Sequence, residues 1–192
     1  MGQFEYLLIL ASVILGLAVS DIAVSLNRLL EVRVRWDWLA PLAAALAFLK
    51  ITTQWWGWYS GVSSAKGMTF ENYVAVLVSA VLLFLMAAAS LPDRLEESPF
   101  ELRAYYTRVS RRYWLLFATQ TSVSNATAFW INFEVSGQIP PLSSPFLLIT
   151  FLLIVPAAVV LAFVRYRLLH SLCLVVLIGF YGTQLFGHRL GQ

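Results

Sequence analysis

The sequence has little of the chemistry on which disulfide-bonded, metal-binding and catalytic proteins depend. Cys173 is the only cysteine among 192 residues, which excludes an intrachain disulfide and a cysteine-based metal site. The two histidines, His170 and His188, have no acidic or cysteine residue at metal-ligand spacing, so we expect no metal and no cofactor. Ser/His, paired-aspartate and histidine-cluster patterns are missing as well, and an enzyme is therefore the least favoured class of function.

Charge is also scarce. Only 12% of the residues are charged and 60% are apolar, whereas about 25% of residues are charged in soluble domains. Six apolar runs are each close to the length of about 20 residues that a helix needs to cross a hydrocarbon core of about 30 Å. They cover roughly residues 4–29, 38–60, 70–91, 113–133, 146–164 and 168–186. We therefore predict an all-α integral membrane protein with six transmembrane helices. No connection is long enough for a soluble domain, and so small a chain would form a sizeable path only as a homo-oligomer.

Lys and Arg are distributed unevenly between the connections. The connections after the first, third and fifth runs carry ten of the 13 basic residues, which are Arg28, Arg33, Arg35, Arg94, Arg103, Arg108, Arg111, Arg112, Arg165 and Arg167. The other two connections and the termini carry only Lys66 and Arg189. The positive-inside rule predicts that the arginine-bearing connections are cytoplasmic and that both termini lie outside. The same arginines suit an anionic inner leaflet, so the lipid bilayer is the expected partner and nucleic acid is not.

Tryptophans and a proline mark features of individual spans. Trp38 and Trp56 would lie about 27 Å apart along a helix, as expected for anchors in the two interfacial belts. Trp114 and Trp130 bracket the fourth run in the same way. Pro156 predicts a kink in the fifth helix.

The segment 99–112 is predicted to be an amphipathic cytoplasmic helix. Ser98-Pro99-Phe100-Glu101 supplies the cap, first-turn proline and glutamate of a capping box. The helix then either lies along the inner face or continues into the fourth span. It is either a solvated extension or a surface that contacts lipid headgroups or a cytoplasmic protein partner. The candidate contact residues are Arg103, Arg108, Arg111 and Arg112.

Polar side chains within the first two spans are candidate site residues, because each is costly in lipid unless it is paired or hydrated. Asp21 and Ser25 share one face of the first span, and Lys50 and Gln54 share one face of the second. In antiparallel neighbours Asp21 and Lys50 would differ in depth by roughly 9 Å, and each side chain leans toward the other. We predict an ion pair between them, which either locks helix packing or lines a wet cavity that controls ion or proton passage.

The outer half of the fourth span is too polar to face lipid on all sides. Seven polar residues lie between positions 119 and 127, and the amides of Gln120 and Asn125 cannot be satisfied within their own helix. Together with Ser124 they are predicted to be buried, either as hydrogen-bonded glue or as the wall of an aqueous path. The expected partners on other helices are Gln54 and Gln184.

Two short stretches resemble known groups of membrane proteins. Val19-Ser20-Asp21 resembles the Phe-Ser-Asp motif of the six-span endolysosomal and bacterial potassium channels. Val19 replaces the family's Phe and Asp21 lies late in its helix, so no pore residue is carried over. Gly16-Leu17 with Gln54-Trp55-Trp56 is similar to small six-span bacterial inner-membrane proteins of unassigned function, which implies a bacterial inner membrane as the location.

These features favour an ion or small-solute pathway, with Asp21, Ser25, Lys50, Gln54, Gln120, Ser124 and Asn125 as its candidate lining. The alternative is a non-transporting sensor, effector or assembly subunit that docks a cytoplasmic partner through the arginine-rich third connection. A continuous polar cavity would favour the pathway, and a dry bundle with a basic inner face would favour docking.

Overall fold

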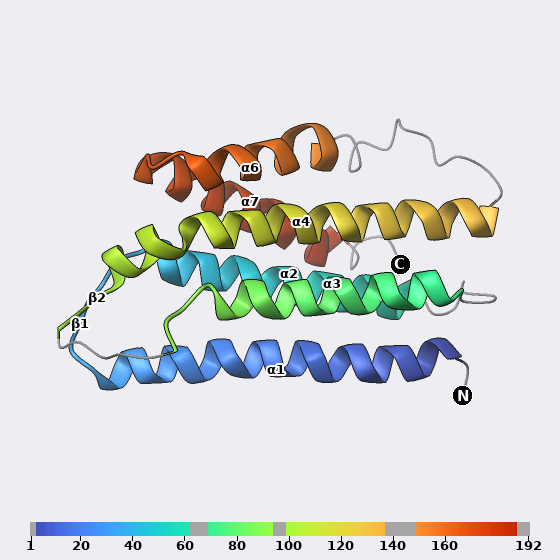
Figure 1. Cartoon of the computed structure of the whole chain (residues 1–192), viewed down its shortest axis with the longest axis horizontal. Helices are drawn as coiled ribbons and strands as arrows, with labels where there is room; N and C mark the ends of the chain where they lie inside the picture. Colours follow the sequence, from blue (N-terminus) through green and yellow to red (C-terminus); the bar gives the residue numbers. More distant parts are fainter. Residues whose placement is uncertain (1–2, 62–68, 94–98, 137–148, 188–192) are drawn as a thin grey trace.

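The computed structural model describes residues 3–61, 69–93, 99–136 and 149–187, and in these ranges the chain folds into long helices (Figure 1). The elements are α1 (Gln3–Glu31), β1 (Val34–Arg35), α2 (Leu39–Gly61), α3 (Phe70–Ala88), β2 (Phe100–Glu101), α4 (Leu102–Ser136), the π-helical turn η2 (Thr150–Ile154), α6 (Val155–Phe163) and α7 (Arg167–Gly187). The predicted helical class is confirmed. Residues 146–148 of the predicted fifth run lie outside the described residues.

In the part of the chain that the structure describes, three helices are long and apolar enough to cross a membrane. Their apolar segments are Tyr6–Glu31 in α1, Phe70–Ala88 in α3 and Arg167–Leu185 in α7. Large apolar side chains, such as Leu17 on α1 and Leu172 on α7, are exposed along these helices. A surface of this kind is unfavourable in water, and it is compatible with insertion into a bilayer.

The helices pack side by side, with α3 between α1 and α4, and α4 between α3 and α6 (Figure 1). The main contacts join α1 to α3, α3 to α4, α4 to α6 and α2 to α7, and α2 also contacts α1, α3 and α4. The core between them contains Leu46, Leu83, Phe117, Leu161 and Leu174, all of which are fully buried. The buried polar residues of α2, α3 and α4, such as Lys50, Ser79 and Gln120, therefore face this shared interior.

The connections α1–α2, α3–α4 and α6–α7 meet at one end of the molecule (Figure 1). We call it the arginine-rich end, and its described arginines are Arg28, Arg33, Arg35, Arg103, Arg108, Arg111, Arg112, Arg165 and Arg167. The opposite end, where α2 and α4 finish, is called the far end. The gathering of these basic residues at one end is the arrangement that the charge pattern of the sequence indicates.

The start of α4 differs from the sequence prediction. Phe100 and Glu101 form β2, which pairs in parallel with β1, and the Phe100 N–H donates to the Arg33 carbonyl at 3.2 Å. The capping-box interpretation was therefore wrong, because this pairing keeps Phe100 and Glu101 extended and the helix begins at Leu102. From there α4 continues without interruption to Ser136, so the amphipathic segment and the fourth apolar run form a single helix.

Pro156 disturbs its helix by changing the hydrogen-bond register. The Val155 N–H donates to the Thr150 carbonyl, five residues earlier, which is the bond of a π-helical turn. A proline lacks the N–H for a regular helix and its ring clashes with the carbonyl four residues earlier, and a wider turn relieves that clash. The sequence predicts a kink at Pro156, and the structure has the π-helical turn η2 directly before α6.

Two ion pairs at the arginine-rich end differ in burial, and they should differ in their contribution to stability. Arg167 at the start of α7 pairs with Asp37, whose side chain is 8% exposed and also accepts from the Leu39 N–H at 3.0 Å. Arg35 pairs with Glu101 at 2.8 Å, where both side chains are largely exposed.

We expect Arg167→Met to lower the free energy of unfolding by about 2–4 kcal/mol, because it leaves the buried Asp37 carboxylate without its cation. The matched change Arg35→Met should cost less than about 1 kcal/mol, because water screens an exposed pair. Unfolding by sodium dodecyl sulfate in mixed micelles measures both variants. Equal losses would contradict this ranking.

Candidate functional site

Lys50 lies in the middle of α2 with its amine enclosed by α4 and α7. Only 4% of the residue is exposed. Its Nζ donates to Thr121 Oγ1 at 3.2 Å and to the Tyr181 hydroxyl at 3.3 Å. The amine also lies 5.3 Å from the ring centre of Phe117 and 4.7 Å from that of Tyr181. Within the described ranges, Lys50 is therefore held by hydroxyl groups and aromatic faces, and not by a carboxylate.

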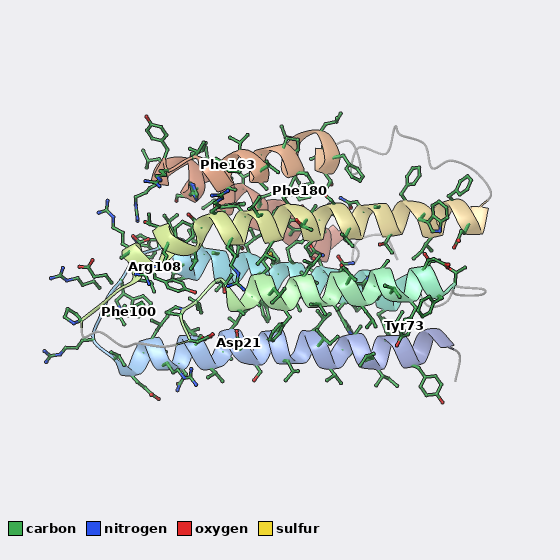
Figure 2. The ribbon with its side chains drawn as sticks, in the orientation of Figure 1. Asp21, Tyr73, Phe100, Arg108, Phe163 and Phe180 are labelled. Atoms are coloured by element: carbon green, nitrogen blue, oxygen red, sulfur yellow. The ribbon has the colours of Figure 1, made fainter. Side chains whose placement is uncertain are left out.

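The predicted ion pair between Asp21 and Lys50 was wrong. Asp21 is half-buried on α1, toward the arginine-rich end (Figure 2). The charged groups that act on it are Asp93 and Arg28. The physical reason is that α1 packs mainly on α3, while Lys50 points to the side of α2 that faces α4 and α7.

Asp21 and Ser25 belong instead to a small polar cluster at the end of α3. Ser25 Oγ donates to Asp93 Oδ1 at 3.5 Å, and Arg28 donates to the Asp93 carbonyl at 2.6 Å. The Tyr105 hydroxyl donates to the nearby Leu91 carbonyl at 2.8 Å. Burial raises the pKa of Tyr105 to about 12, so this hydroxyl keeps the proton that it donates. This cluster fastens the α3–α4 connection and is separate from the Lys50 site.

Gln54, one helical turn beyond Lys50, joins the polar residues of α4. Its Oε1 accepts from Gln120 Nε2 at 3.3 Å and from Ser124 Oγ at 2.6 Å. Gln120 Nε2 also donates to Ser79 Oγ on α3 at 3.2 Å. Gln120 is 0% exposed and Asn125 is 7% exposed, so their predicted burial is confirmed, as is the choice of Gln54 as a partner. Gln184, the other expected partner, makes no hydrogen bond to these residues in the described part of the chain.

Buried and partly buried polar groups continue from Lys50 toward the far end, where the run ends at the exposed Glu134. Asn72 Nδ2 on α3 donates to Glu134 Oε2 on α4 at 2.7 Å, and Trp130 Nε1 donates to Glu134 Oε1 at 2.9 Å. We call this run the polar seam, and its members are Lys50, Gln54, Asn72, Ser79, Gln120, Thr121, Ser124, Asn125 and Glu134. Within the described residues, Gln120 Oε1 and Asn125 Nδ2 are buried without a hydrogen-bond partner. The seam therefore keeps one acceptor and one donor free for a further group.

On the other side of Lys50, toward the arginine-rich end, the interior is aromatic. We call this cluster the aromatic plug, and it consists of Tyr106, Tyr113, Trp114, Phe117 and His170. Trp114 contacts Phe117 edge to face, with ring centres 5.7 Å apart, and the Tyr113 hydroxyl donates to the Ala43 carbonyl at 2.8 Å. The polar seam is thus closed at one side by closely packed rings.

A hydrogen-bonded triad within the plug was not found by sequence reasoning. His170 Nε2 lies 2.8 Å from the Val164 carbonyl, which can only accept, so Nε2 carries a proton. Its Nδ1 then accepts from Trp114 Nε1 at 3.1 Å and from the Tyr106 hydroxyl at 3.0 Å. Burial raises the pKa of Tyr106, which keeps that hydroxyl protonated. Trp114 is 0% exposed, so its assignment as an interfacial anchor was wrong, because its indole N–H has a buried acceptor.

The four arginines proposed for lipid or partner contact all lie exposed on the first part of α4. Arg111 places its guanidinium 4.9 Å from the ring centre of Phe163 on α6. Arg103 and Arg108 line a groove together with Arg165, a residue that the sequence reasoning counted only as part of the charge pattern. Arg112 is exposed and does not line the groove.

No protein-family model, curated protein or solved structure matches this chain. What the protein does must therefore follow from the chemistry of its own buried and exposed groups. The Lys50 amine and the polar seam are its most costly internal features.

Because no described carboxylate neutralises the Lys50 amine, this residue should contribute little to the free energy of unfolding. We expect Lys50→Met to leave the free energy of unfolding unchanged or to raise it by up to about 2 kcal/mol, because an apolar chain of similar volume removes a buried amine without orphaning a charge. The control Gln120→Met should lower it by about 1–2 kcal/mol through loss of two hydrogen bonds. Thermal unfolding in detergent tests both. A large loss for Lys50→Met would identify Lys50 as a structural residue.

Proposed function

We propose that this chain is a six-span membrane protein whose polar seam lines a path for a small ion, entered from the far end and ending at Lys50. The observation that carries the proposal is the Lys50 amine, which is buried and, among the described residues, donates to Thr121 and Tyr181 and pairs with no carboxylate. Such an amine weakens the fold, and groups of this kind inside membrane proteins commonly belong to ion or proton pathways.

The seam favours a small anion, or a proton carried by the amine itself. Lys50 is its basic group at mid-depth, and the described acid of the seam, Glu134, lies at the far end bound to Asn72 and Trp130. Cation paths are lined by carboxylates or rings of carbonyls, whereas basic residues line anion paths. Gln120 Oε1 and Asn125 Nδ2 add an acceptor and a donor between these two points.

The path is closed in this conformation. Gln120, Thr121 and Asn125 are buried in tight packing, and the aromatic plug separates Lys50 from the arginine-rich end. Passage across the whole membrane then requires the plug to move, and Phe117 is the plug residue whose ring lies 5.3 Å from the Lys50 amine. Outward access to Lys50 and inward release would alternate, as in transporters whose binding site lies near mid-membrane.

Ion flux into liposomes tests this function. The full chain is reconstituted, and uptake of chloride, potassium and protons is followed in parallel with encapsulated indicator dyes. We expect chloride or proton uptake and no potassium uptake. Lys50→Met should reduce the flux by about tenfold or more, because loss of one hydrogen bond to the ion raises the barrier by at least about 1.4 kcal/mol.

The chain provides a matched control for this experiment. Lys66, its other lysine, lies in the connection between α2 and α3, and Lys66→Met should leave the flux unchanged. An inactive wild-type protein would exclude the pathway under these conditions. Equal flux in wild type and Lys50→Met would remove Lys50 from it.

A second candidate function is that of a non-transporting subunit that docks a cytoplasmic protein. It is favoured by one observation, the groove lined by Arg103, Arg108 and Arg165 at the arginine-rich end. Under this function the seam would serve helix packing alone, and Lys50→Met would change neither flux nor partner binding.

Both functions share a proposed topology in which the arginine-rich end is cytoplasmic and both termini lie outside. In a Cys173→Ser background, a cysteine introduced by Arg103→Cys should react with a membrane-impermeant maleimide only after cells are permeabilised. A cysteine introduced by Ser64→Cys, in the connection between α2 and α3, should react in intact cells. The reverse labelling pattern would invert the topology.

A further inference from the structure

An open groove at the arginine-rich end has a basic lining. Its volume is about 610 Å³, and it is lined by Glu101, Arg103, Ala104, Thr107, Arg108 and Arg165. Positions 103, 104, 107 and 108 share one face of the first turns of α4, because residues three and four apart lie next to each other on a helix. Arg165 comes from the connection between α6 and α7, so the groove joins two parts of the fold.

The charge of the groove is not balanced within the described part of the protein. Its one acid, Glu101, is already paired with Arg35 at 2.8 Å. The arginines of the described ion pairs are Arg35 and Arg167. None of the three groove arginines, Arg103, Arg108 and Arg165, has a carboxylate partner among the described residues. Thr107 also lines the groove, but its Oγ1 already donates to the Arg103 carbonyl at 2.9 Å. The hydrogen-bond donors that the groove can offer to a ligand are therefore the guanidinium groups. Several guanidinium forks around one groove match a phosphoryl group.

One side of the groove continues into an apolar surface. On α6, Phe163 is 62% exposed and Val159 and Val160 are also exposed. The Arg111 guanidinium lies over the Phe163 ring at 4.9 Å, which joins the basic face of α4 to this apolar face of α6. Figure 2 places Arg108 and Phe163 toward the same end of the molecule. A basic recess beside exposed hydrocarbon has the two-part chemistry of a phospholipid.

We propose that this groove binds the phosphorylated headgroup of an anionic phospholipid, with an acyl chain lying along α6. Arg103, Arg108 and Arg165 hold the phosphoryl oxygens, and Val160 and Phe163 contact the chain. The proposal goes beyond the ion path and rests on the proposed topology, in which this end faces the anionic inner leaflet. It assigns distinct roles within the arginine-rich segment, because Arg111 stacks on Phe163 and Arg112 lies outside the groove.

The experiment measures lipid retention by the full chain. The protein is placed in phosphatidylcholine nanodiscs containing a minor fraction of phosphatidylglycerol, and native mass spectrometry counts the lipids that remain bound. We expect phosphatidylglycerol to be retained over phosphatidylcholine. The double variant Arg103→Gln with Arg165→Gln should reduce retention by about tenfold, because each lost fork removes a charge-assisted interaction.

The control is a second double variant, which removes the same number of positive charges from the same end of the molecule. Arg33→Gln with Arg112→Gln removes two exposed arginines that do not line the groove, and it should retain phosphatidylglycerol as the wild type does. Equal losses in the two double variants would reduce the effect to general electrostatics and overturn the site. If the wild type showed no preference for phosphatidylglycerol over phosphatidylcholine, the proposed lipid site would also be overturned.

Two competitors separate a lipid from other anions. Glycerol 3-phosphate should displace phosphatidylglycerol only weakly, because it lacks the acyl chain. If it binds as tightly as the lipid, the groove is a site for free phosphorylated solutes and the lipid proposal is wrong. Strong displacement by a polyglutamate peptide would assign the groove to an acidic protein partner. Because lipid composition is fixed in the nanodiscs, these outcomes do not depend on the flux experiment or on the labelling of intact cells.

Discussion

The arrangement of this protein depends on one constraint, which is that the polar side chains of α2 and α4 must face one another and stay away from the apolar outer surface of the helices. Lys50 and Gln54 on α2, and Gln120 and Asn125 on α4, would each be costly at a lipid-facing surface. Lys50, Gln120 and Asn125 are buried and Gln54 is partly buried, because they lie where the two helices exchange hydrogen bonds, with Gln54 accepting from both Gln120 and Ser124. The helices α1, α3 and α7 present exposed apolar side chains to the outside, and α3 turns Asn72 and Ser79 toward α4.

Periodicity and composition predicted the parts of the structure that depend on single helices. The bounds of α1, α2, α3 and α7 lie close to those of the apolar runs, whereas α4 begins at Leu102, before the fourth run. The burial of Gln120 and Asn125 follows because no rotation of one helix hides polar residues on several faces. The predicted contact with Gln54 rested on equal depth, which the helix rise fixes.

Predictions that required the choice of a neighbouring helix were less successful. The pair of Asp21 and Lys50 assumed that consecutive helices are the closest neighbours, whereas α1 packs mainly on α3. Trp114 resembles an interfacial anchor in the sequence, but its burial depends on His170, which is 56 residues away. The extended form of Phe100 depends on pairing with Val34, a contact that no local pattern indicates.

The two halves of the interior have different chemistry, and this asymmetry gives the proposed path its direction. Beyond Lys50 toward the far end, the nearest groups of the polar seam are amides and hydroxyls, such as those of Gln54, Gln120 and Ser124. Toward the arginine-rich end they are aromatic rings in edge-to-face contact, anchored by the triad of Tyr106, Trp114 and His170. An ion that reaches Lys50 would therefore meet a polar wall behind it and an apolar barrier ahead of it.

The same distinction between engaged and free groups applies to the arginines. A positive-inside bias alone requires only charge, and any exposed position at one end would satisfy it. Here Arg167 pairs with Asp37, Arg28 binds the Asp93 carbonyl and Arg111 stacks on Phe163, so these arginines also fasten connections and helices together. Arg103, Arg108 and Arg165 converge on one groove without a carboxylate partner in the described residues. The proposed topology explains why these three side chains are basic. It does not explain why they line one groove beside the exposed apolar side chains of α6. A bound anionic lipid explains both their charge and their position.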